Sequence, residues 1–257
     1  MGLSLSPTPA SLDLAQLGDA AHWLRPGTLQ LPALPPLSLY VHLPWCLKKC
    51  PYCDFNSYTL REPLGERAYV DALLLDVETQ LELRGDFISD RPITTVFMGG
   101  GTPSLFSPES IGRVLDRIKE IHPVLVDAEI TLEANPGSFE TDRFRAFRAA
   151  GVTRLSLGVQ SFHDGFLTAL GRVHNRAQAL AAAQEAAQTF DTFNLDIMYG
   201  LPGQTLADLS ADLSTALSLS PPHISVYHLT VEPNTRFAKY PPVLPDEDSA
   251  SDMLDLI

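Results

Sequence analysis

The sequence has 257 residues and a formal net charge of −13, from 18 Lys and Arg against 31 Asp and Glu. An acidic chain repels phosphate backbones, so we expect no nucleic-acid partner. No apolar run approaches the roughly 18 residues of a membrane-spanning helix, so we expect no transmembrane segment. The N-terminus lacks the cationic and apolar pattern of a secretory signal, which favours a cytoplasmic location.

Three cysteines lie within eight residues, at Cys46, Cys50 and Cys53. An odd, clustered set in a chain without an export signal favours a metal or cofactor site in a reducing compartment over a set of disulfides.

Residues 1–37 are rich in Pro, Leu and Ser and predict an irregular N-terminal arm. From residue 38, short apolar runs alternate with longer stretches of helical spacing. The predicted strands are Ser38–Leu43, Ile93–Met98, Glu129–Ala134, Arg154–Val159, Phe193–Tyr199 and Ile224–Val231. The predicted helices span residues 66–84, 108–121, 140–150, 164–189 and 205–219.

Alternating strands and helices imply parallel pairing through right-handed crossovers. An open sheet would gather functional residues at one switch point, whereas a barrel places them after every strand. Here polar residues and glycines occur at or just after the ends of all six predicted strands. We therefore predict an α/β fold, a partial (β/α)6 barrel over residues 38–240.

Residues 241–257 combine a Pro-rich linker with the first turn of a helix, in which Met253, Leu254 and Ile257 begin an apolar stripe. We expect this segment to be a linker and the start of a truncated C-terminal part. The alternative is a short terminal helix.

The cysteine segment is predicted to be a loop, because Pro51 removes a helical hydrogen bond and clashes with the preceding turn. A loop can wrap three thiolates around an iron–sulfur cluster, and three ligands on a four-iron cube leave one iron open to another ligand. The alternative is a structural zinc site with four ligands. Its nearby fourth candidates are His42 and Asp54, and we expect His42 to point away from the loop.

Three further features indicate a ligand site. Glycines 99–101, followed by Thr102, lack side chains, so a ligand can approach the backbone there. No lysine follows in the position of a phosphate-binding loop. Asp196 lies in an apolar strand, where an unpaired carboxylate is unfavourable. Glu133 ends the third strand, and its position fits a ligand contact and a surface residue equally well.

The segment Leu39–Cys46, followed by C-x3-C-x2-C, resembles the radical S-adenosylmethionine (SAM) superfamily. It is most similar to the branch that contains oxygen-independent coproporphyrinogen III oxidase and the heme chaperone HemW. The resemblance covers residues 38–240, with several motifs in the same order. It implies a 4Fe–4S cluster on Cys46, Cys50 and Cys53, with SAM bound beside it.

The resemblance also implies a role for eight residues in binding SAM. Tyr40 matches a tyrosine near the sulfonium, and Arg172 matches an arginine that meets the methionine carboxylate. Gln160 and Asp196 match residues that hold the ribose hydroxyls. The residues expected at or beside the amino group are Gly100, Gly101, Thr102 and Glu133. His174 is predicted to be a solvated helix residue.

One feature separates the two members of this branch. In the oxidases a fourth cysteine follows the third after one residue, whereas here Cys53 precedes Asp54-Phe55-Asn56-Ser57. This favours a heme chaperone, which implies heme or a porphyrin as ligand, an electron donor and a client hemoprotein. The alternatives are the oxidase, which decarboxylates porphyrinogen propionates in heme biosynthesis, and another SAM-cleaving radical enzyme.

Overall fold

The structure is a computed structural model that describes residues 34–88, 90–137 and 143–257. The chain divides into two compact units, Met1–Pro35 and Pro36–Ile257, and the features below belong to the second. The predicted arm therefore lies almost wholly outside the described residues.

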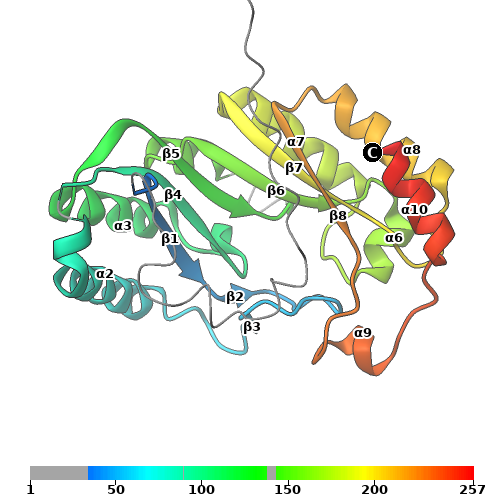
Figure 1. Ribbon diagram of the computed structural model, residues 1–257, viewed down its shortest axis with the longest axis horizontal. Coiled ribbons are helices and arrows are strands. Elements are labelled where there is room, and N and C mark those ends of the chain that lie inside the picture. Colours follow the sequence, from blue (N-terminus) through cyan, green and yellow to red (C-terminus); the bar gives the residue numbers. More distant parts are fainter. Residues whose placement is uncertain (1–33, 89, 138–142) are drawn as a thin grey trace, which may run out of the picture. The chain divides into compact units, whose positions relative to one another are not determined.

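One sheet of six parallel strands organises this unit (Figure 1). Its strands are β1 (Leu37–Leu43), β4 (Ile93–Gly100), β5 (Val124–Ala134), β6 (Arg154–Gln160), β7 (Thr192–Tyr199) and β8 (His223–His228). Their order in the sheet follows their order in the chain, and every neighbouring pair is parallel. This is the order expected of a partial barrel, and the predicted α/β fold is confirmed.

Helices connect the strands. They are α2 (Glu66–Ile88), α3 (Pro108–Ile121), α5 (Phe144–Ala149), α6 (Asp164–Ala169), α7 (Arg176–Thr189), α8 (Leu206–Ser218), α9 (Arg236–Lys239) and α10 (Glu247–Leu256). A short 3₁₀ turn, η2 (Pro103–Leu105), follows β4, and β2 (Trp45–Cys46) pairs with β3 (Tyr58–Thr59). Local sequence sets several helix starts: Ser107 caps α3, and Asn175 and Thr205 form capping boxes at α7 and α8.

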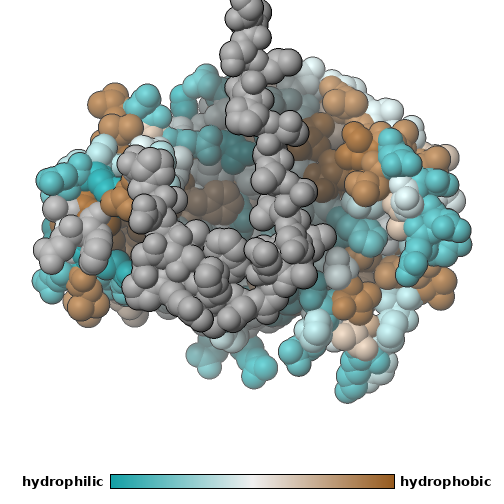
Figure 2. Space-filling model, in the orientation of Figure 1, coloured by the Kyte–Doolittle hydropathy of each residue, from teal (hydrophilic) through white to brown (hydrophobic). Residues whose placement is uncertain are grey.

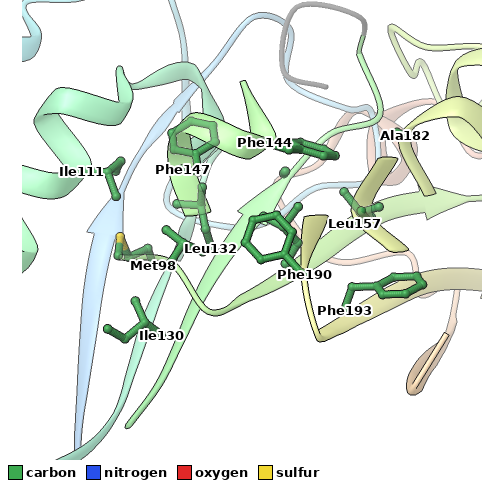
Figure 3. Packing of buried hydrophobic residues seen from close by; sticks show 14 of the residues in the cluster. Met98, Ile111, Ile130, Leu132, Phe144, Phe147, Leu157, Ala182, Phe190 and Phe193 are labelled. Carbon is green, nitrogen blue, oxygen red and sulfur yellow. The ribbon is translucent and has the colours of Figure 1, made fainter. Parts of the chain in front are cut away.

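The strands bury one set of alternating residues against the helices (Figure 3). In β6 and β7, Leu155, Leu157, Leu195 and Ile197 are fully buried in this core. Helices supply the opposite side, including Phe144 and Phe147 of α5 and four alanines of α7. The remaining strand residues point to the inner face of the partial barrel, and many of these are polar.

Several predicted boundaries are wrong: the strand predicted from Glu129 begins at Val124, and the helix predicted to end at residue 84 continues to Ile88. The predicted helix 164–189 is two helices, because the chain turns at Gly171, which has a φ of +67°, and Asn175 then caps a new helix. The predicted strand Ile224–Val231 ends at His228. The start of the predicted helix 140–150 lies outside the described residues, and α5 begins at Phe144.

The segment 241–257 contains the short helix α10, capped by Asp246. Met253 is 1% exposed and packs against Tyr199 and Leu209, so α10 is fixed to the barrel.

None of the helices in the described ranges has the length and apolar character to span a membrane. On the face shown in Figure 2, outside the grey atoms, apolar and polar residues intermingle.

Asp212 of α8 ties this helix to the end of β6. Its side chain is buried and accepts hydrogen bonds from the Ser161 hydroxyl at 2.6 Å and the Phe162 backbone N–H at 2.7 Å. We expect Asp212→Ala to lower the free energy of unfolding by about 2–3 kcal/mol, because both donors lose their partner in the interior. Urea unfolding measures this loss. Asp191→Ala, at an exposed ion pair with Arg148, should change it by less than about 1 kcal/mol. Equal losses of unfolding free energy in the two variants would contradict the structural role assigned to Asp212.

Candidate functional site

A pocket of about 370 Å³ opens at the C-terminal ends of the strands. This volume lies within the range of small-molecule sites. Its lining includes all three cysteines and every residue predicted to contact SAM except Tyr40: Gly100, Gly101, Thr102, Glu133, Gln160, Arg172 and Asp196. The structure therefore brings together residues spread over 150 positions of the sequence, from 46 to 196.

The cysteine segment is a loop, as predicted. Cys46 ends β2, and the Cys53 N–H donates to the Cys50 carbonyl at 3.2 Å. The Lys49 ammonium holds the loop closed by donating to the carbonyls of Phe55 at 2.8 Å and Ser57 at 3.1 Å. No three His, Cys, Asp or Glu side chains in the described ranges meet at the position of a single metal ion. A four-iron cube instead takes each thiolate at a separate corner.

His42 braces this loop, so the expectation that it points away is wrong. Its Nε2 lies 2.8 Å from the Asn56 carbonyl and its Nδ1 lies 3.0 Å from the Tyr40 hydroxyl. Because a carbonyl only accepts, Nε2 carries the proton and Nδ1 accepts from Tyr40. Tyr40 is 56% exposed and lies outside the pocket lining. The pKa of its hydroxyl is raised, mainly by partial burial and secondly by the nearby Glu133 carboxylate.

The glycine run lets the cysteine loop lie against β4. A β-carbon on Gly101 would sit 2.5 Å from the Pro44 carbonyl carbon, and one on Gly100 would overlap the His42 ring. Gly100 also has a φ of +114°, which side chains disfavour. Backbone hydrogen bonds from Gly101 to Leu43 and from Thr102 to Trp45 complete the contact, at 2.9 and 2.7 Å. The β-carbon side of these glycines is thus filled by protein, while Gly100 and Gly101 still line the pocket, as a ligand that approaches their backbone would require.

Glu133 is a largely buried carboxylate at the end of β5. Burial raises its pKa to about 7, a nearby Asp196 adds to this, and a hydrogen bond from the Gly100 N–H at 3.2 Å opposes it. A carboxylate in this state gains stability when a cation arrives beside it. The side chain is therefore suited to an ammonium group.

Asp196 lies on the inner face of β7. Burial raises its pKa to about 6, and hydrogen bonds from Asn194 and Ser156 oppose this shift. Asn194 donates at 2.6 Å, and the Ser156 hydroxyl lies 3.3–3.4 Å from both carboxylate oxygens. Gln160 ends β6 at a φ of 69°, a left-handed backbone that side chains adopt mainly at constrained sites.

Arg172 lies in the loop between α6 and α7. Its guanidinium donates to the Asn135 side chain, to the Gly158 carbonyl at 2.8 Å and to the Cys50 sulfur at 3.4 Å. Its Nε–H is buried and has no partner in the described part of the chain. A buried, unused donor on a cation fits an anionic ligand group.

His174, two residues on, is buried in the same loop, so the prediction of a solvated helix residue is wrong. Its Nε2 donates to the Val159 carbonyl at 3.1 Å. Burial and then the Arg172 charge lower its pKa to about 4, which keeps the ring neutral.

The pocket lining also contains residues that the sequence did not predict, among them Tyr52, Asn135 and Ser156. Asn135 donates to the Thr102 hydroxyl at 3.0 Å and accepts from Arg172, so it connects two predicted residues. Strand alternation could have identified Asn135 and Ser156, because each lies two residues from a predicted inner position or an inward glycine. Tyr52 has no such signal; its burial, which raises its pKa, results from packing against α9.

These observations define a pocket whose lining combines three thiols, a guanidinium with a buried, unused donor, and two largely buried carboxylates. The thiols suit an iron–sulfur cluster. The cation and the carboxylates suit a zwitterionic ligand that bears hydroxyl groups, as SAM does.

The profile described as the radical SAM superfamily matches residues 40–216, and the chain belongs to this superfamily. The family implies a 4Fe–4S cluster and SAM. Two curated relatives are named heme chaperone HemW: one from Haemophilus influenzae is 50% identical over 88% of this chain, and one from Escherichia coli is 48% identical over 86%. The chain spans 59% and 58% of their lengths.

A solved structure of coproporphyrinogen III oxidase (HemN) from Escherichia coli, described as a radical SAM enzyme, is also similar. It has a TM-score of 0.77 and 31% identity over 86% of this chain and 51% of its own. Both members of the branch named from the sequence, the heme chaperone and the oxidase, are thus among the proteins to which this chain is similar.

The raised pKa of Glu133 predicts a pH-dependent stability. A group whose pKa rises on folding stabilises the fold at low pH, and this stability is lost as the pH rises through the folded value, here about 7. We expect Glu133→Gln to gain up to about 3 kcal/mol over the wild type between pH 5 and pH 8. Urea unfolding of the metal-free chain measures this. The exposed Glu62→Gln is the control; parallel pH profiles for wild type and Glu133→Gln would contradict the prediction.

The packing of the glycine run predicts that Gly101→Ala blocks cluster assembly. The added methyl group would displace the backbone of Pro44 and Trp45, which leads directly into Cys46. After anaerobic reconstitution, we expect bound iron and sulfide to fall severalfold. Gly85→Ala in α2 is a matched control, because nothing lies within 4 Å of its β-carbon, and it should keep its iron and gain about 0.5–1 kcal/mol of stability. Full iron loading in Gly101→Ala would refute the role of Gly101 in positioning the cysteine loop.

Proposed function

We propose that this chain is the radical SAM part of a heme chaperone: it holds a 4Fe–4S cluster on Cys46, Cys50 and Cys53, binds SAM beside it, binds heme, and delivers heme to a client hemoprotein. The observation that carries this is its identity of 48–50% to relatives named heme chaperone HemW. The proposal includes an electron donor for the cluster and a reducing, cytoplasmic location.

The pocket supports the assignment of SAM. The Arg172 Nε–H faces no protein partner in the described residues, which suits the methionine carboxylate. Glu133 suits the ammonium group, and Thr102, Gly100 and Gly101 lie beside it on the pocket wall. Gln160 and Asp196 also line the pocket, which makes them available to hold the ribose hydroxyls.

The pocket mouth supports a flat, apolar ligand. Phe55 and Tyr227 both line the pocket and are 62% and 52% exposed. Large apolar surface left open at a site edge favours binding of an apolar partner. Lys48 also lines the pocket and could pair with a propionate.

The second candidate is a coproporphyrinogen III oxidase, which the structural similarity to HemN favours. In that enzyme class, SAM is cleaved reductively and the resulting radical takes hydrogen from a porphyrinogen propionate. Phe55 stands in this chain where the oxidase pattern has its fourth cysteine. This difference favours the chaperone. A third candidate is another hydrogen-abstracting radical SAM enzyme.

An anaerobic assay of the reconstituted chain separates these functions. We expect hemin to bind and shift its visible absorbance, and bound hemin to pass to an apo-hemoprotein. We expect coproporphyrinogen III to remain unreacted with SAM and a reductant. Decarboxylation at a catalytic rate would favour the oxidase, and a chain that leaves the hemin spectrum unchanged would contradict the chaperone.

The cluster assignment is tested with Cys50→Ser. We expect the reconstituted wild type to contain iron and sulfide, and SAM to alter the paramagnetic spectrum of its reduced cluster. Cys50→Ser should lose both properties, because one of three thiolates is gone. Ser57→Ala, beside Cys53 at 3.8 Å, is the control and should retain iron. Zinc as the sole bound metal would refute the cluster.

A further inference from the structure

A polar network lies on the inner face of the partial barrel and reaches the pocket lining through Ser156 and Asp196. It joins Ser156 of β6, Asn194 and Asp196 of β7, and His223 and Ser225 of β8. Asn194 is 1% exposed and forms the centre. A buried amide is strongly unfavourable unless its donors and acceptor are paired, so each of its contacts constrains its orientation.

The donor and acceptor of each hydrogen bond in this network can be deduced by starting from the Asp196 carboxylate. An ionised carboxylate only accepts, so the Asn194 amide nitrogen faces it and donates to Oδ1 at 2.6 Å. The same nitrogen donates to the Ser156 hydroxyl at 2.9 Å. That hydroxyl can then direct its own proton to Asp196.

The Asn194 carbonyl oxygen consequently faces β8, where two donors meet it. His223 Nδ1 lies at 2.5 Å and the Ser225 hydroxyl at 3.1 Å. Both N–H groups and both lone pairs of the amide are thus in use. A flipped amide would place its NH₂ group against the His223 donor and its oxygen against a carboxylate.

The Asp196 carboxylate is thus held by protein hydrogen bonds and still has lone pairs that can accept further ones. Asp196 Oδ1 receives Asn194, whereas Oδ2 holds only the 3.3 Å contact from Ser156 within the described part of the chain. Asp196 also lines the pocket. Its remaining acceptor capacity is therefore available to a pocket ligand.

We propose that Asn194, held by His223 and Ser225, is the positioning residue that orients Asp196 toward the vicinal hydroxyls of a nucleoside ligand. This rests on the proposed assignment of the pocket to SAM and does not depend on heme. Ser156 acts with Asn194 as the second support.

Titration calorimetry on the anaerobic, cluster-loaded chain tests this with two ligands: SAM, and the SAM analogue whose ribose lacks both hydroxyls. Asn194→Leu removes the donor to Asp196 while keeping the side-chain volume. We expect SAM to bind about tenfold more weakly and the analogue to change by less than about twofold. Asp196→Asn should show the same selective loss, and the double variant should lose no more than about twofold beyond either single one.

His223 offers a matched pair of variants. His223→Asn keeps an N–H donor where Nδ1 lies and should bind SAM within about twofold of the wild type. His223→Phe removes the donor and should reproduce part of the Asn194→Leu loss. If Asn194→Leu does not fold, as judged by the thermal unfolding of the metal-free chain, Ser225→Ala is the milder substitute.

If Asn194 contributed to stability alone, its replacement would weaken the binding of SAM and of the analogue by the same factor, or the losses in the double variant would be additive. Either result would overturn the proposal. Failure of the wild type to bind SAM would overturn it together with the pocket assignment. A negative hemin titration would leave these binding results unaffected, so the two proposals fail independently.

Discussion

The two-residue side-chain period of the parallel strands is the constraint on which the rest of the structure depends. Along β6, Leu155 and Leu157 enter the core while Ser156 and Gly158 face the inside of the partial barrel. Each buried leucine contributes about 1.5–3 kcal/mol, so a shift of one residue would expose the core and bury the polar set. The apolar residues thus fix the register, and the register places the polar residues in the pocket.

The cysteine loop depends on this register through close backbone contact. β1 and β4 pair so that His42 lies opposite Gly99 and Leu43 opposite Gly100. Only glycine leaves room there for the His42 ring, and that ring in turn holds the loop at Asn56. The α6–α7 loop closes the other side, because a β-carbon on Gly171 would meet Pro51 at 2.9 Å. The three thiols are thus positioned by two glycine contacts far apart in the sequence.

The sequence predicts the fold, the three cysteines and seven further pocket residues, because these follow from strand alternation, from motifs at strand ends and from the resemblance to the superfamily. Prediction from the sequence failed where tertiary packing determines what surrounds a side chain. His174 was expected in solvent because helical spacing hid the turn at Gly171, and nothing in the sequence shows that His42 packs over the glycine run. Asn194 was overlooked because its importance lies in its partners, which come from two other strands.

The strand register also bears on where a difference between the two candidate functions, heme transfer and porphyrinogen chemistry, would arise. The pocket floor consists of inward strand residues and the thiol loop, and it serves a cluster and SAM in either function. HemN shares this fold at 31% identity and a TM-score of 0.77, so the strand register that builds the floor does not separate the two candidate functions. Under the proposed function, discrimination would fall to exposed lining residues such as Phe55 and Tyr227, which lie outside the core clusters. There a side chain can change without disturbing the strand register, and the ligand that rests on the mouth can change with it.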